Sequence, residues 1–136
     1  MTLRRAAFLL SILAASLLIL AGCGGTPAIT ASPAQLDLGK ISSTAPMSGT
    51  VQLTNTGAGT LRLGDLRTSC GCTSAVAAQT SLKSGASTDL TITFDPLTHP
   101  GLYGPVMRIV YVASNAEAEL EIPVFVTILT PEEESP

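Results

Sequence analysis

Hydrophobic and polar residues alternate with a period of two through most of the chain. The clearest run is residues 119–128, where the apolar positions are Leu120, Ile122, Val124, Val126 and Ile128. Residues 50–54 and 90–94 alternate in the same way. Such alternation places one face of a strand in a core and the other face in water. Pro123 falls on the outward phase, where a missing N–H donor suits an edge or a bulge.

A different pattern marks residues 106–112, which are apolar on both phases apart from Arg108. This pattern is typical of a central strand that is covered on both faces. Turn-forming residues separate the runs, in residues 55–59, 83–85 and 95–101. After Ala34, no segment has the sustained spacing of three to four residues that a helix requires. The pattern therefore predicts an all-β domain.

About seven strands in roughly a hundred residues, with regular turns between them, is typical of a two-sheet sandwich of immunoglobulin type. The hallmarks of an antibody domain are missing, because the chain has no tryptophan and Cys70 and Cys72 are too close to bridge two sheets. We therefore predict an immunoglobulin-like β-sandwich without the usual disulfide between sheets.

The amino terminus carries the pattern of an export signal. Arg4 and Arg5 precede an apolar run that ends in Leu20-Ala21-Gly22-Cys23. The run is short for a membrane span, and small residues mark a cleavage point. The order leucine, small, small, cysteine resembles the bacterial lipobox, which implies cleavage before Cys23 and lipid attached to it; two or three acyl chains make a stable anchor. An ordinary signal peptide or an uncleaved membrane anchor is the alternative.

We expect four segments along the chain: a lipoprotein signal peptide over 1–22, a lipidated flexible tether over 23–33, the immunoglobulin-like domain over 34–129 and a disordered acidic tail over 130–136. Cleavage leaves 114 of 136 residues, which suits one domain. Five of the seven basic residues then remain against ten acidic ones, a formal net charge of −5. An acidic surface repels phosphate backbones, so we expect no nucleic-acid partner. The expected partners are the membrane, through the lipid anchor, and a protein of the cell envelope.

Several short motifs resemble one bacterial family. The chain contains Leu53-Thr54-Asn55-Thr56-Gly57, Leu61-Arg62-Leu63, Thr68-Ser69-Cys70-Gly71-Cys72-Thr73, and Ser84-Gly85 before a strand that ends at Phe94-Asp95. Over residues 34–128 it resembles the bacterial Domain of Unknown Function 1573. The resemblance implies an exported, often lipid-anchored protein whose fold is similar to hydin-like and PapD-like domains. It also implies that Cys70, Gly71, Cys72 and Thr73 are a family signature.

Cys70 and Cys72 are the candidate redox or disulfide pair. In a straight strand their Cα atoms would lie about 6.6 Å apart, so a disulfide requires the chain to bend at Gly71. In the chain-entropy model so small a ring adds only about 1.6 kcal/mol, which indicates that stability is not its main role. Three roles stay open: a structural turn with inert cysteines, thiol–disulfide exchange, and Cu(I) binding by two thiolates.

Few other residues support these roles. Arg67 is the nearest cation that could favour a thiolate, and His99 or Met107 could supply a third copper ligand. A histidine in a turn segment is nevertheless typical of a solvent-facing loop. Asp95-Pro96 predicts a turn rather than a catalytic carboxylate.

No catalytic triad or nucleotide motif is present, so we assign no catalytic residue and expect no cofactor other than Cu(I). The fold favours a lipid-anchored, extracytoplasmic and non-enzymatic module for binding or assembly at the cell envelope, because sandwich edges can accept a strand from a partner. The alternative is thiol–disulfide exchange or Cu(I) handling through Cys70 and Cys72.

Overall fold

The computed structural model describes residues 24–135, so the predicted signal peptide and Cys23 lie outside the described residues. One short 3-10 helix, η1 (Pro96–Thr98), interrupts a chain of strands. The strands are β1 (Ile29–Ser32), β2 (Leu36–Ile41), β3 (Met47–Asn55), β4 (Leu61–Thr68), β5 (Thr73–Ala77), β6 (Ser81–Leu82), β7 (Ser87–Phe94), β8 (Gly104–Ser114) and β9 (Leu120–Ile128).

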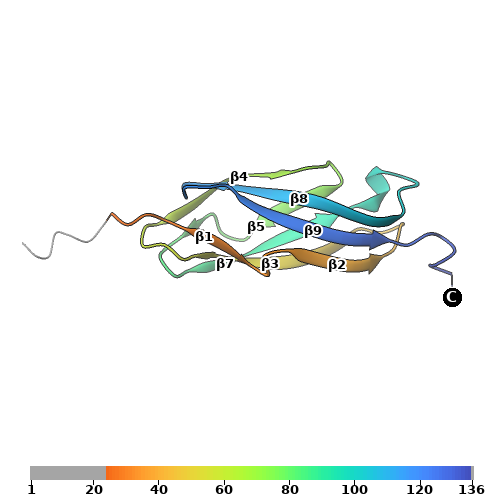
Figure 1. Ribbon diagram of the computed structural model, residues 1–136, viewed down its shortest axis with the longest axis horizontal. Coiled ribbons are helices and arrows are strands. Elements are labelled where there is room, and N and C mark those ends of the chain that lie inside the picture. Colours follow the sequence, from red (N-terminus) through yellow and green to blue (C-terminus); the bar gives the residue numbers. More distant parts are fainter. Residues whose placement is uncertain (1–23, 136) are drawn as a thin grey trace, which may run out of the picture.

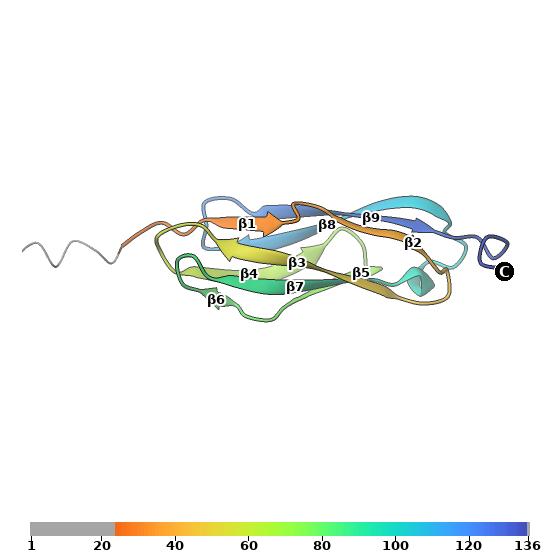
Figure 2. The ribbon, with the colours of Figure 1, turned by 90° about the horizontal axis from the view of Figure 1, so that it is seen from below.

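The strands form two sheets that pack face to face in an elongated sandwich (Figures 1 and 2). The four-stranded sheet has the order β1-β3-β7-β5, and the five-stranded sheet has the order β2-β9-β8-β4-β6. Neighbouring strands are antiparallel except for β2 and β9, which run parallel. This architecture confirms the predicted immunoglobulin-like sandwich. It has more strands than predicted because β1 and β6 are too short to show a clear alternation.

The predicted inward positions form the core between the sheets. Fully buried side chains include Val51, Leu53, Leu90, Ile92, Phe94, Ile122 and Val124. The larger core cluster surrounds Leu53 and Leu90, and a smaller one surrounds Phe94 and contains Cys72. The cysteine motif is thus tied directly to the core.

Strand β8 is central in its sheet, as predicted, but it is not covered on both faces. Met107 is 51% exposed, because the outer face of a two-layer sandwich meets solvent. Pro123 lies opposite Ile109 of β8, just before Val124, where the described pairing of β9 with β2 begins. Pro123 lacks an N–H, and it lies in a part of β9 that does not pair with β2. β9 itself is an inner strand, so Pro123 is not on an edge strand.

The chain enters the sandwich earlier than the predicted boundary at residue 34. Residues 29–32, which the sequence assigned to the tether, form β1 and pair with β3 from Ile29↔Asn55 to Ser32↔Gln52. Four residues of mixed polarity gave no clear strand signal. In the described part of the chain, no helix has the length and apolar character needed to cross a bilayer.

The two ends of the described chain lie at opposite ends of the sandwich. Residues 24–28 enter at one end, while the η1 loop and the carboxyl terminus lie at the other (Figures 1 and 2). Near the carboxyl terminus, the Glu133 carboxylate accepts hydrogen bonds from Thr130, and the Glu134 carboxylate accepts one from the Ser43 backbone N–H. The sequence predicts disorder for residues 130–136, and the mobility of this segment stays a prediction.

Candidate functional site

The cysteine motif is the connection that carries the chain from the five-stranded sheet to the four-stranded sheet. Ser69 extends the pairing of β4 with β8, because its N–H donates to the Ile109 carbonyl and its hydroxyl accepts from the Ile109 N–H, both at 2.9 Å. Thr68 Oγ1 then donates to the Cys70 carbonyl at 2.9 Å. These bonds hold Cys70 at the point where β4 ends and the chain turns.

Cys70 and Cys72 form a disulfide, with their Cα atoms 5.2 Å apart. The predicted bend at Gly71 is therefore present. The Cys72 N–H donates to Cys70 Sγ at 3.1 Å, and the Thr73 N–H donates to the Cys70 carbonyl at 3.2 Å. Cys72 is 2% exposed and packs beside Phe94, whereas Cys70 is only partly buried. Of the two cysteines, Cys70 is thus the more exposed and Cys72 is protected.

His99 reaches this disulfide from the loop after β7. Asp95 begins the loop as the cap of η1, and its carboxylate accepts from the Leu97 N–H at 2.9 Å. This confirms the turn role predicted for Asp95. Thr98 Oγ1 donates to the Asp95 carbonyl, and the His99 N–H donates to the Pro96 carbonyl. His99 is exposed, as expected of a loop residue, yet its Nε2 lies 3.4 Å from Cys70 Sγ.

Arg108 reaches the other sulfur from β8. Its Nε–H donates to Cys72 Sγ at 3.3 Å, and its Nη1 donates to the Met107 carbonyl at 3.0 Å. Arg108 is the polar residue that interrupted the apolar run of residues 106–112. A charged side chain within an apolar strand requires a polar partner. The position of Arg108 in this run was therefore the sequence feature that could have indicated a contact with the cysteine pair.

Two residues suggested by the sequence lie elsewhere. Arg67 forms a salt bridge with Glu119 at 2.7 Å and stacks over the Tyr111 ring, 5.2 Å from its centroid. The hydrogen bond and the charge of Glu119 raise the pKa of Arg67. Met107 is on the outer face of its sheet, opposite in phase to Arg108. Neither residue serves the disulfide.

The arrangement supports two kinds of chemistry. A guanidinium beside Cys72 and an imidazole beside Cys70 are the surroundings in which thiolates form and disulfides exchange. The donor atoms of Cys70, Cys72 and His99 also lie within 4.8 Å of one another, a set that can hold a soft metal ion once the pair is reduced. Thr73 supports the motif from β5, with its Oγ1 3.7 Å from Cys72 Sγ.

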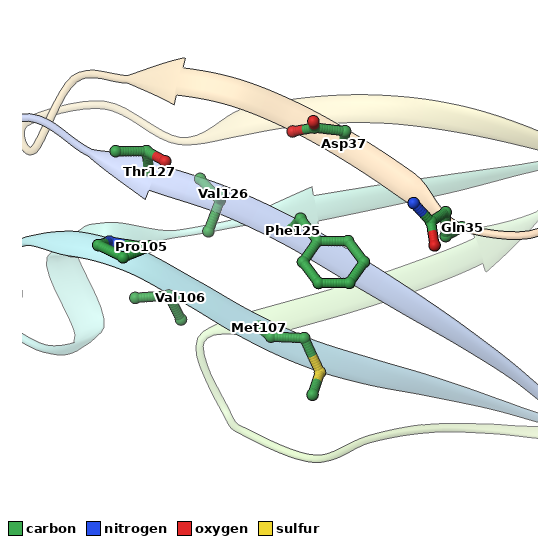
Figure 3. A pocket seen from close by; sticks show the side chains of 8 residues that line it. All are labelled: Gln35, Asp37, Pro105, Val106, Met107, Phe125, Val126 and Thr127. Carbon is green, nitrogen blue, oxygen red and sulfur yellow. The ribbon is translucent and has the colours of Figure 1, made fainter.

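A shallow groove of about 460 Å³ lies on the other face of the five-stranded sheet. Phe125 of β9 and Met107 of β8 are register partners and lie side by side in it, with Asp37 and Gln35 at its margin (Figure 3). Because side chains of successive strand residues point to opposite faces, this groove is separate from the disulfide.

The fold and the cysteine motif define an immunoglobulin-like β-sandwich with a disulfide at the crossover between its sheets. The family model described as "Protein of unknown function (DUF1573)" matches residues 29–126, and the chain belongs to this family. No curated protein matches the chain.

Solved structures support the fold. A protein of unknown function from Porphyromonas gingivalis W83 is 25% identical with a TM-score of 0.64, over 79% of this chain and 48% of its own. SSP-19, an MSP-domain-like protein of Caenorhabditis elegans, is 19% identical with a TM-score of 0.52, over 72% of this chain and 98% of its own. The periplasmic chaperone SfaE is 11% identical with a TM-score of 0.52, over 80% and 64%. The chain spans about half the length of the Porphyromonas protein and less of the secreted protease VesC from Vibrio cholerae, where it covers 24%.

Proposed function

We propose that this protein is a lipid-anchored, extracytoplasmic module that binds thiol-bearing proteins of the cell envelope and exchanges disulfides with them through Cys70 and Cys72. The observation that carries the proposal is that each sulfur of the pair has a nitrogen-bearing side chain from another element beside it. His99 approaches Cys70, and Arg108 donates to Cys72. A disulfide that only closed a turn would need neither contact.

Exchange begins at Cys70, because Cys72 is 2% exposed and cannot be reached by a partner. A partner thiolate attacks Cys70 Sγ, and a new disulfide bond forms between them. The Cys70–Cys72 bond breaks, and its electron pair stays on Cys72 Sγ. The Nε–H of Arg108 stabilises that thiolate, since hydrogen bonds to ionised groups are stronger than neutral ones.

The second step releases the partner. The second thiolate of the partner attacks the partner sulfur that is bonded to Cys70, and the partner disulfide forms. The bond to Cys70 breaks, and Cys70 leaves with its electron pair. His99 takes the proton of the first partner thiol and gives it to Cys70, because an imidazole nitrogen can both accept and donate a proton. The proton of the second partner thiol passes through solvent to the Cys72 thiolate. In sum, two electrons and two protons pass from the partner dithiol to the cysteine pair. The reverse sequence reduces a partner disulfide.

The exchange is tested on the mature domain purified from its native envelope. The domain is equilibrated in glutathione buffers of defined ratio, quenched with acid, alkylated and weighed by mass spectrometry. We expect the pair to titrate reversibly between disulfide and dithiol as a two-electron couple. A pair that stays fully oxidised in excess dithiothreitol would show that the motif is structural.

A trapping experiment tests the direction of attack. Cys72→Ser keeps the accessible Cys70 thiol and removes the thiol that would resolve a mixed disulfide, so disulfide-linked adducts with envelope proteins should accumulate. Cys70→Ser is the matched control, because it leaves only the protected Cys72. Equal trapping by the two variants would contradict attack at Cys70.

Cu(I) handling is a second candidate, favoured by the three donor atoms that lie within 4.8 Å of one another. A thiol reductant first supplies two electrons to open the disulfide; the two thiolates and the His99 imidazole then form a soft set of three ligands. The test is an anaerobic Cu(I) titration of the reduced domain against a chromogenic chelator. One equivalent should bind, more weakly after His99→Ala. Binding that is unchanged by Cys70→Ser with Cys72→Ser would exclude this site.

The lipid anchor is tested separately at Cys23. Metabolic labelling with a radioactive fatty acid should label the native protein and not Cys23→Ala. A Cys23→Ala protein that is still processed and remains in the membrane fraction would contradict lipidation.

A further inference from the structure

Strand β5 has an open edge that begins directly at the disulfide. On one side β5 pairs with β7, where the Cys72 carbonyl accepts from the Asp95 N–H and the Ala78 N–H donates to the Asp89 carbonyl. Because the hydrogen-bonding direction alternates along an antiparallel strand, Ala75 and Ala77 direct their N–H and C=O groups to the opposite side. The sheet order places β5 last in its sheet, so within residues 24–135 no strand pairs with this edge.

The other edges near this one carry the features that prevent strand addition. β2 and β4 each carry charged residues and a register shift in the pairing with their inner neighbour; Asp37 and Lys40 flank the shift on β2. The part of β8 beside the motif begins with Pro105, which has no N–H, and Arg108 already occupies the Met107 carbonyl. Charges, prolines and bulges are the usual protection of edge strands. The β5 sequence TSAVA has none of them.

Val76 of β5 adds an apolar contact beside this edge, since its side chain is 67% exposed. A strand added to β5 would place a side chain next to it on the same face. Such pairing of extended segments through main-chain bonds, with side-chain contacts for selectivity, is a known way for sheets to bind peptides.

Gly71 supplies a second, independent observation. Its φ is not in the left-handed region, and a Cβ at this position would meet no atom within 4 Å. Neither the turn nor the packing of the domain therefore requires glycine. Glycine within a strand pattern also occurs where another backbone approaches closely. Gly71 is exposed and directly follows Cys70, the more exposed of the two cysteines.

We infer that the partner of the exchange reaction binds as an extended peptide segment, added to β5 as a further strand, and that it passes over Gly71 to present a cysteine to Cys70. The inference rests on the proposed function and names its substrate class: a cysteine in an extended segment of a protein, in preference to a small thiol. From Cys72 to Ala77 the edge spans about 16 Å, so about six residues of the partner would pair.

The test uses Cys72→Ser protein whose Cys70 carries a chromogenic aromatic thiol in a mixed disulfide. The second-order rate of release is measured with glutathione and with a peptide of about eight strand-forming residues that ends in cysteine. The same peptide, N-methylated at alternate residues, keeps its thiol and loses its donors. We expect the native peptide to react at least about tenfold faster than glutathione, and the N-methylated peptide to lose that advantage.

Variants of the protein, instead of the peptide, also test docking on β5. Gly71→Val and Ala75→Pro should each lower the ratio of the peptide rate to the glutathione rate. Met107→Ala, on the outer face of the other sheet, is the control and should leave the ratio unchanged. Because the N-methylated peptide needs no change in the protein, the inference can be tested even where Ala75→Pro does not fold.

The possible results distinguish a failure of docking on β5 from a failure of disulfide exchange at Cys70. Equal rates for both peptides and for glutathione would overturn docking on β5 while leaving disulfide exchange intact. A Cys70 adduct that no thiol displaces would overturn the proposed function itself. If gel filtration and cross-linking show that β5 pairs with β5 of a second copy, the edge is occupied by self-association and the inference is wrong.

Discussion

Asn55 and the cysteine pair are two polar centres of the sandwich, and they differ in the partners of their hydrogen-bonding groups. Asn55 is fully buried, and each of its side-chain atoms is used by backbone. Its Oδ1 accepts from the N–H groups of Ala28 and Gly57, at 3.4 and 3.0 Å, and its Nδ2 donates to the carbonyls of Gly59 and Leu82, at 2.7 and 3.0 Å. Asn55 therefore holds three segments against β3: the residues before β1, the turn between β3 and β4, and β6.

At the cysteine pair, most contacts of the two sulfurs are made by side chains instead of backbone. Cys70 is only partly buried, and its sulfur accepts one backbone N–H. The other contacts of the disulfide come from the side chains of Thr73, His99 and Arg108. The glycines show the same difference. A Cβ at Gly59 would lie 1.9 Å from the Gly25 carbonyl oxygen, whereas one at Gly71 would meet nothing within 4 Å. A polar side chain whose hydrogen-bonding atoms all bind backbone groups supports the fold. A polar centre that contacts other side chains and is partly exposed to solvent is a candidate for function.

The largest expected effect is the loss of stability in Asn55→Ala. Four backbone groups lose their partner, and buried unsatisfied groups are costly, so we expect about 3 kcal/mol or more of destabilisation in urea unfolding. Asn115→Ala is the matched control, because Asn115 also bridges two backbone groups but is exposed. Equal losses would remove the distinction between the two centres.

Gly59 and Gly71 differ in the space that is available for a side chain. Gly59→Ala forces a clash with backbone and should cost about 2 kcal/mol or more, whereas Gly71→Ala should stay within about 0.5 kcal/mol of the native domain. Thermal unfolding of the two variants side by side measures this. A strongly destabilised Gly71→Ala would mean that the turn does require glycine, and the space above it would need no partner to explain it.

A smaller effect is expected for the arginines. Arg108→Ala removes the donor to Cys72 and should slow the opening of the disulfide by glutathione by about tenfold, since a hydrogen bond to a charged group is lost. Arg67→Ala removes an arginine that contacts Glu119 instead and should leave the rate unchanged. Stopped alkylation at timed intervals gives both rates. Identical rates in the two variants would show that the contact of Arg108 has no role in exchange.

The smallest effect concerns the carboxyl-terminal segment beside the His99 loop. The backbone hydrogen bond from Ser43 lowers the pKa of Glu134, and hydrogen bonds from Thr130 lower the pKa of Glu133. A lowered folded pKa means that these contacts contribute fully above the unfolded pKa and are lost as the pH falls through the folded pKa. The Ser43 amide resonance should therefore shift on acidification, and Glu134→Gln should abolish the shift. A Ser43 resonance that titrates equally in Glu134→Gln would contradict the contact.

The fold followed from the sequence because alternation is a local signal. Val51, Leu53, Leu90 and Ile92 are buried as their phase predicts. Alternation does not report what lies outside a sheet, so the prediction that β8 is covered on both faces was wrong at Met107. Strand β1 was missed because four residues of mixed polarity resemble a linker.

The candidate site was predictable only in part. The bend at Gly71 followed from the spacing of Cys70 and Cys72, since a disulfide across one residue demands it. The partners of the sulfurs depend on strand pairing, which no local pattern reports. Arg67 is near in sequence but belongs to the outer face, whereas Arg108 comes from a strand brought alongside by the β4–β8 register.

Residues 24–28 and the η1 loop lie at opposite ends of the sandwich (Figures 1 and 2), and this arrangement limits how far from the membrane the disulfide can lie. With Cys23 lipidated as proposed, the link to β1 is five residues and extends at most about 18 Å. From Ser114 to Ile109, the residue to which Ser69 bonds just before the disulfide, strand β8 adds about 17 Å along the sandwich. The anchor therefore limits the height of the disulfide: it would meet partner cysteines within a layer of about 35 Å above the bilayer, and cysteines displayed farther out would not be reached whatever their reactivity.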